Sequence, residues 1–250
     1  MNLIGHNYIA KKVLSKYNPL IAAGAHIPDE VEFVSSSVFS YEGIHENPDV
    51  VFEYVTKSDR KYIDLALGMI AHSVKYGADK YTGDIEKWLF KGNESLRNTI
   101  ADKIVQASGI SIETAKGPRM HNYLWGGLDF YLIDKYPEFV NEIKENYKAI
   151  DTDQISEILS HAYNKNLDRV RENIEKHIGL VNKYDVSSKV GFVKFWKDFV
   201  SELPEKDNVD LDKAVSCINF IENTFEKDWE EVINRVVKDI KLRMSTFIQD

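Results

Sequence analysis

Apolar residues recur at three- and four-residue spacing along almost the whole chain. In the stretch from Ser58 to Tyr81, Leu65, Met69 and Ser73 follow one another at four-residue intervals, which places them on one face of an α-helix. No stretch of the sequence shows the sustained alternation of apolar and polar residues that is typical of a half-buried strand. The pattern predicts an all-α protein built as a multi-helix bundle.

Proline and glycine residues suggest where several helices begin and end. Asn47 followed by Pro48 resembles an N-cap with proline at the first helical position, and predicts a helix that begins there. The pair Gly126-Gly127 indicates either a helix break or a close helix crossing. The other expected helices cover residues 96–104 (before Gly109), 118–132, 137–147, 155–159, 170–178, 193–200 and a long amphipathic stretch, 211–248.

The chain has 250 residues, enough to bury one substantial core, and no linker rich in Gly, Ser or Pro divides it. We therefore expect a single helical domain over residues 1–250, in which residues 136–250 complete the packing. The net charge of −8 has the wrong sign for a protein that neutralises phosphates, so no obligate nucleic-acid partner is expected. No run approaches the roughly 20 apolar residues of a transmembrane segment.

The single cysteine, Cys217, cannot form an internal disulfide. The first residues lack the basic start and apolar core of a secretion signal. These features predict a cytoplasmic protein, unless a leader has been removed from the sequence.

Four histidines and one acid in the first half of the chain are the main candidates for a functional site. They are His6, Asp29, His45, His72 and His121. Imidazole and carboxylate are ligands that zinc prefers, and their place among helical patterns predicts a metal site assembled between helices.

The order of these motifs resembles that of the zinc-dependent phospholipase C family, which is related in fold to the single-strand-specific zinc nucleases. The resemblance covers roughly the first 135 residues. Members are all-helical and carry up to three clustered zinc ions that activate water to cleave phosphodiester bonds. The matching motifs are His6 with Ile9-Ala10, the segment from Gly24 to Pro28-Asp29, His45, Gly68 with His72, and His121 with Asp129.

The resemblance implies that Asp29, His45 and His72 share one metal ion, with His6 near a second ion and His121 near a third. One zinc ion is the expectation, and up to three are compatible with the motifs. The implied substrate is a small phosphodiester or a phospholipid headgroup.

The chain departs from the family pattern at three positions. The family places an Asp four residues after the helix His, a His four residues beyond that, and a Glu four residues after the later His. This chain has Tyr76, Lys80 and Trp125 there, so the metal site is degenerate. If Lys80 points inward, its ammonium group could stabilise a bound phosphate as a fixed charge.

Asp79 lies seven residues after His72. On a continuous helix this spacing corresponds to about 10 Å along the axis, too far for both side chains to bind one metal. We therefore expect Asp79 to serve a separate ion with His121.

Two functions follow. Asp29, His45 and His72 leave a fourth tetrahedral position for water, which is typical of catalytic zinc and predicts metal-dependent hydrolysis of a phosphodiester. The alternative is a relative that lost the chemistry and acts as a binding or interaction protein. The candidate residues also have structural alternatives: His6, His72 and His121 as packing residues, and Asp29 as a turn or helix cap. Asp129 is expected to hydrogen-bond a neighbouring helix. The sequence identifies no catalytic side chain beyond the metal ligands, no further cofactor and no oligomeric state.

Overall fold

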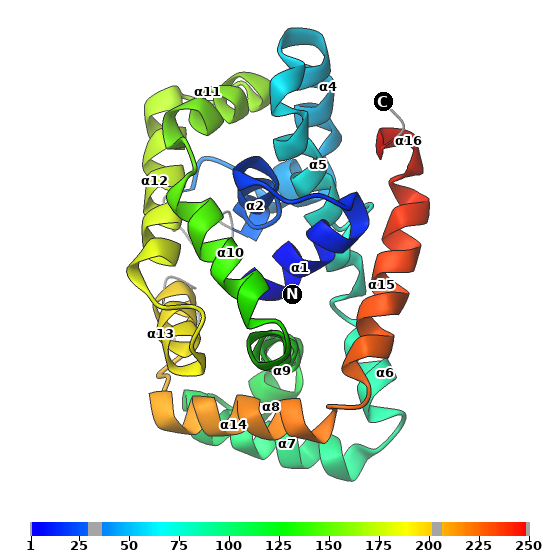
Figure 1. Ribbon diagram of the computed structural model, residues 1–250. Coiled ribbons are helices and arrows are strands. Elements are labelled where there is room, and N and C mark those ends of the chain that lie inside the picture. Colours follow the sequence, from blue (N-terminus) through cyan, green and yellow to red (C-terminus); the bar gives the residue numbers. More distant parts are fainter. Residues whose placement is uncertain (1, 30–36, 202–206, 249–250) are drawn as a thin grey trace.

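The computed structural model of the protein describes residues 2–29, 37–201 and 207–248, and within these ranges it contains helices and no strand (Figure 1). The predicted all-α multi-helix bundle is confirmed. The α-helices are α1 (Leu3–Leu14), α2 (Pro19–Gly24), α4 (Asp49–Ser58), α5 (Ile63–His72), α6 (Asp84–Phe90), α7 (Glu94–Ser108), α8 (Ile112–Lys116), α9 (Met120–Lys135), α10 (Pro137–Lys148), α11 (Thr152–Tyr163), α12 (Leu167–Lys183), α13 (Lys189–Val200), α14 (Leu211–Thr224), α15 (Trp229–Arg243) and α16 (Ser245–Ile248). Short 3-10 helices are η1 (Ile27–Asp29), η3 (Arg60–Tyr62) and η4 (Ala78–Tyr81), and η2 (Glu42–Glu46) is a π-helical turn.

The outer helices surround the N-terminal helices α1 and α2 (Figure 1). In that view α11, α12 and α13 form one side, α7 and α14 the base, and α15 the opposite side. The buried apolar residues form one continuous cluster that extends from Leu3 to Met244. Segments from both halves of the chain therefore contribute to the same core.

Helices α2 and α5 cross at a point where only glycine fits. A Cβ atom on Gly24 would lie 2.2 Å from the carbonyl oxygen of Leu65, and one on Gly68 would lie 2.7 Å from that of Ile21. Side chains at these positions would therefore force the two helices apart. The close crossing brings the segment after α2 beside the end of α5.

Helix boundaries agree with several of the sequence signals. Helix α7 ends at Ser108 with Gly109 in the left-handed conformation (φ +66°), and α10 begins at Pro137. The pair Gly126-Gly127 marks a close crossing, because α9 continues through it and a Cβ atom on Gly127 would lie 2.5 Å from Cγ2 of Ile221.

Three predicted boundaries are wrong. The helix expected to continue towards Tyr81 ends at His72. Helix α4 begins one residue later than expected, with Pro48 rather than Asn47 at the N-cap position. The stretch 211–248 contains three helices, because the chain turns after α14, where the amide of Asp228 donates to the carbonyl of Phe225 (2.8 Å).

No helix in the described ranges is both long and apolar enough to cross a membrane.

Candidate metal centre

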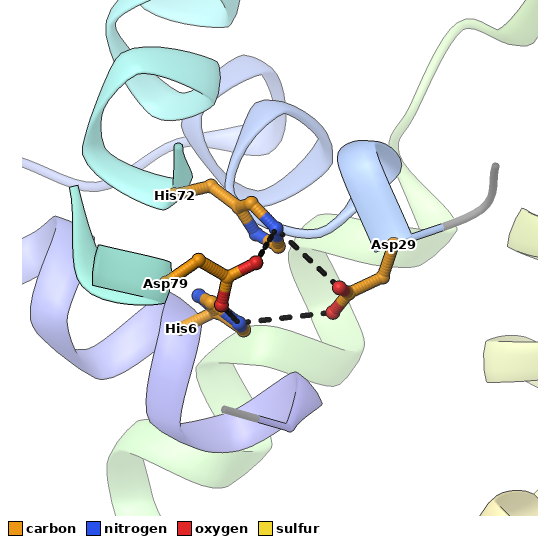
Figure 2. A group of neighbouring side chains, drawn as sticks. All are labelled: His6, Asp29, His72 and Asp79. Carbon is orange, nitrogen blue, oxygen red and sulfur yellow. Dashed lines mark ion pairs between the residues drawn. The ribbon is translucent and has the colours of Figure 1, made fainter. Parts of the chain in front are cut away.

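Two histidines and two aspartates converge between the helices. One ligand atom from each of His6, Asp29, His72 and Asp79 lies within 4.8 Å of the corresponding atom of every other (Figure 2). His45 joins them, since its Nε2 lies 3.6 Å from Oδ1 of Asp29 and 3.5 Å from Oδ2 of Asp79. The four residues of the tighter group could hold a metal ion. His6 lies on α1, Asp29 on η1, His45 on η2, His72 on α5 and Asp79 on η4.

Asp79 reaches this group because α5 stops at His72. Ser73 leaves the helical conformation (φ −52°, ψ 158°), and the chain reverses before η4 begins. A Cβ atom on Gly77 would lie 2.3 Å from the carbonyl oxygen of Ala71, so glycine permits the returning chain to pass this close to the helix end. Oδ2 of Asp79 consequently lies 3.1 Å from Nε2 of His72. The expectation that these two residues are too far apart for one metal was wrong, because it assumed a continuous helix.

The ring of His72 is oriented by a main-chain contact. Its Nδ1 lies 2.8 Å from the carbonyl oxygen of Ala25, in the segment after the α2–α5 crossing. A carbonyl oxygen only accepts hydrogen bonds, so Nδ1–H donates and Nε2 faces the carboxylates. Partners of this kind fix the orientation of metal-ligating histidines.

Helix α1, which carries His6, is held at its start by Asp129. Oδ1 of Asp129 accepts a hydrogen bond from the amide of Gly5 (2.6 Å), so this residue bonds a neighbouring helix as expected. Burial raises the pKa of Asp129 to about 8, although the bond from Gly5 opposes the shift.

In each of Asp29 and Asp79, one carboxylate oxygen faces His45 and His72, and the other faces His6. Oδ1 of Asp29 and Oδ2 of Asp79 lie 3.1–3.6 Å from Nε2 of His45 and His72. The other oxygens, Oδ2 of Asp29 and Oδ1 of Asp79, lie 3.7 and 3.2 Å from Nε2 of His6. Two ligand atoms bound to one tetrahedral zinc ion at about 2.1 Å lie about 3.4 Å apart. The nitrogen–oxygen distances, both to His45 and His72 and to His6, are therefore compatible with cations bound jointly by imidazole and carboxylate groups.

Five of the six ring nitrogens of His6, His45 and His72 lack a hydrogen bond of normal geometry, although each Nε2 lies within ion-pair distance of a carboxylate. In the part of the chain that the structure describes, both ring nitrogens of His6 and of His45, and Nε2 of His72, have no hydrogen-bond partner. Leaving a buried polar atom unsatisfied costs about 1–3 kcal/mol. A cation between the nitrogens and the carboxylates would supply the missing interaction, so these residues fit a divalent metal that accepts nitrogen and oxygen ligands.

Each imidazole and carboxyl group of the centre shifts the pKa of its neighbours. Burial alone would lower the pKa of His72, but the carboxylates of Asp79 and Asp29 raise it to about 10. Burial and the adjacent His72 lower the pKa of His6 to about 4. Burial opposes ionisation of both carboxyl groups, yet the neighbouring His72 holds the pKa of Asp29 and of Asp79 well below the usual range. A bound cation would take over the role of the His72 charge and release its proton.

The sequence analysis missed His26, which contacts this group, and His177, which contacts His26. Nε2 of His26 lies 3.4 Å from Oδ2 of Asp29, and Nδ1 of His26 lies 3.0 Å from Nε2 of His177 on α12. The i, i+3 spacing of His26 and Asp29 was the available signal. His177 gave only a weak signal, because it lies on the apolar face of α12 three residues after Ile174.

Other predicted residues lie outside the group. His121 lines the neighbouring cavity and, among the described residues, forms no hydrogen bond or ion pair with the group. Lys80 is exposed, so it does not meet the condition of pointing inward on which its contact with a bound phosphate depended. Tyr76 packs edge-on against Phe247, and Trp125 is fully buried. Asp79 joins the main group and also lines the cavity with His121, so the pairing of these two residues on a separate ion stays a prediction.

A cavity of about 270 Å³ lies beside the centre. Asp29 and Asp79 form part of its wall, and α13 contributes three aromatic side chains to it. The lining residues are Asn2, Leu3, His26, Asp29, Tyr41, Val74, Asp79, Thr82, His121, Asn122, Phe195, Trp196, Phe199 and Val200.

Comparison of the chain with protein-family models, with curated proteins and with solved structures finds no match.

Proposed function

We propose that the protein is a zinc-dependent hydrolase of phosphodiesters. The observation that carries the proposal is the convergence of imidazole nitrogens without hydrogen bonds on two shared carboxylates, at the wall of a cavity. The donor set of nitrogen and carboxylate oxygen favours zinc over magnesium or calcium, which prefer oxygen alone. The substrate is a small phosphodiester or a phospholipid headgroup.

In this proposal, the carboxylate oxygens that face His45 and His72 bind one ion, and those that face His6 bind a second. His45 and His72, with Oδ1 of Asp29 and Oδ2 of Asp79, would hold one ion. His6, with the two remaining carboxylate oxygens, offers three donor atoms and so leaves a position for water at a second ion. Bound zinc lowers the pKa of its water to about 7 and polarises a phosphoryl oxygen.

The chain itself orients these groups and shields them. The bond from His72 to Ala25 holds one imidazole with its free nitrogen towards the carboxylates. Helix α13 lines the cavity with apolar side chains, which would reduce the contact of a bound phosphate with bulk water. Asn122, at the start of α9, also lines the cavity and offers amide hydrogens to a phosphoryl oxygen.

The second candidate function is metal binding without catalysis, in a relative of the zinc-dependent phospholipase C family that has lost the chemistry. It is favoured by Trp125, which stands fully buried where the family has a ligand carboxylate, so that position supplies no donor to a third ion. Elemental analysis and an activity assay on the same preparation separate the two functions.

The experiment uses protein purified without added metal. We expect at least one zinc ion per chain and hydrolysis of bis(p-nitrophenyl) phosphate that a chelator abolishes and zinc restores. His72→Ala should lose both zinc and hydrolysis, whereas His161→Ala, which changes an exposed histidine of α11, should retain both. Bound zinc without hydrolysis supports the binding protein, and protein without zinc affinity overturns both functions.

A further inference from the structure

The cavity beside the metal centre has an apolar wall as well as a polar one. Phe195, Trp196 and Phe199 of α13 form this wall and are 1%, 3% and 8% exposed. The cavity measures about 270 Å³, and one of about 150 Å³ already accommodates benzene. One six-membered ring therefore fits against α13 and leaves room for a phosphoryl group at the carboxylates.

Aromatic contacts hold the wall in place. The ring of Trp196 packs edge-on against that of Tyr123 (centroids 4.9 Å apart, 84°), and the hydroxyl of Tyr123 is hydrogen-bonded to Oγ of Ser108 (2.6 Å). The rings of Phe195 and Phe199 stack with centroids 5.6 Å apart. A wall fixed by such packing binds a flat group without first having to become ordered.

No lysine or arginine lines the cavity in the part of the chain that the structure describes. Arg119, two residues before His121, is not available to it, because its guanidinium is paired with Asp207 at 2.9–3.1 Å. Metal ions held at Asp29 and Asp79 would supply positive charge for a bound phosphate. A second negative charge on the phosphate would find no lysine or arginine within the described lining, which is unfavourable in a partly enclosed cavity.

We propose that the cavity selects phosphodiesters that carry a small aromatic ring on one ester oxygen, binding the ring against Phe195, Trp196 and Phe199, and that it discriminates against phosphomonoesters. The inference rests on the proposed function, because the metal centre supplies the attraction for the phosphate. A diester carries one negative charge, whereas a monoester, with a second pKa of about 6, carries nearly two at pH 8.

Three phosphate esters distinguish the effect of the aromatic ring on binding from the effect of the phosphate charge. Binding of methyl phenyl phosphate, dimethyl phosphate and phenyl phosphate to the zinc-loaded full chain is measured by calorimetry at pH 8. We expect methyl phenyl phosphate to bind about tenfold more tightly than either of the others, since dimethyl phosphate lacks the ring and phenyl phosphate has the extra charge. Equal binding of dimethyl phosphate, or tighter binding of phenyl phosphate, overturns the proposal.

Two matched variants locate the ring site. Phe199→Leu should weaken binding of methyl phenyl phosphate about fivefold, within the range of an aromatic contact, and leave dimethyl phosphate within twofold. Phe192→Leu is the control, because Phe192 is also buried on α13 but does not line the cavity. Equal effects of the two variants on methyl phenyl phosphate overturn the assignment of the ring site.

Hydrolysis is assayed separately, with bis(p-nitrophenyl) phosphate. The binding preference without hydrolysis supports the cavity assignment and contradicts the proposed enzyme. Hydrolysis without the preference supports the enzyme and overturns the cavity assignment.

Discussion

Oδ2 of Asp79 lies 3.1 Å from Nε2 of His72, although the two residues are separated by a complete reversal of the chain. The reversal places Asp79 opposite Asp29, so that each carboxylate has one oxygen towards His6 and one towards His72 (Figure 2). The geometry of the centre therefore depends on the segment between α5 and η4.

Gly77 is the position in this segment where a side chain would do most harm. Gly77→Ala places a methyl group 2.3 Å from the carbonyl oxygen of Ala71, which must displace the returning chain and with it Asp79. We expect the affinity for zinc, measured by competition with a chromogenic chelator, to fall about 10- to 100-fold, as when groups that orient ligands are lost. Gly83→Ala is the control, since nothing lies within 4 Å of the added atom. Similar affinities of the two variants would show that the segment tolerates displacement.

The α2–α5 crossing predicts an effect on stability. Gly68→Ala would bring a Cβ atom within 2.7 Å of the carbonyl oxygen of Ile21, and backbone atoms on both sides leave little room to relax. We expect the free energy of unfolding, from urea denaturation, to fall by about 1–3 kcal/mol. Gly179→Ala, on α12 with nothing within 4 Å of its Cβ position, should instead raise it by up to about 1 kcal/mol, because alanine is the better helix former. A stabilised Gly68→Ala protein would contradict the tight crossing.

The sequence predicted those parts of the fold that depend on local pattern. Apolar spacing identified the helices, and Pro137 and Gly109 marked boundaries, because these residues have strong backbone preferences. The resemblance indicated His6, Asp29, His45 and His72, which the structure brings together.

The sequence did not predict how Asp79 joins them. Ser73 and Tyr76 continue the helical spacing of α5, so the pattern alone gives no reason to end the helix at His72. The reversed segment is held to a distant part of the chain by the amide of Val74, which donates to the carbonyl oxygen of His45 (3.1 Å), and a local pattern does not contain this contact. His177 was missed for a related reason, because a histidine on an apolar helix face has the same spacing as a core residue.

The contact between His26 and His177 gives a further prediction. Because His177 holds the Nδ1 side of His26 (3.0 Å), it directs Nε2 towards Asp29. His177→Leu should weaken zinc binding about tenfold through the loss of this orientation. His177→Gln, which can still donate or accept a hydrogen bond, should retain affinity within about threefold. Chelator competition measures both, and equal losses would indicate that the residue contributes packing alone.

Asp129 predicts how stability changes with pH. Burial raises the pKa of this carboxyl group from 3.8 to about 8 in the folded protein, so between these pH values the folded state binds one more proton than the unfolded state. The contribution of Asp129 to the free energy of unfolding is therefore fully present below pH 4 and is lost as the pH rises towards 8. One pKa unit corresponds to about 1.4 kcal/mol, which sets an upper bound of about 6 kcal/mol on this loss.

Asp129→Asn removes the titration while its amide oxygen can still accept the bond from Gly5. Relative to the unchanged protein, the variant should therefore become progressively more stable between pH 5 and pH 8, and the difference should level off above pH 8. Urea unfolding at several pH values under the same metal conditions measures it. Asp102→Asn, at an exposed position of α7, should show no such trend. Parallel stability profiles for the Asp129 variant and the unchanged protein would mean that Asp129 is already ionised in the folded state, with Oδ2 satisfied by water.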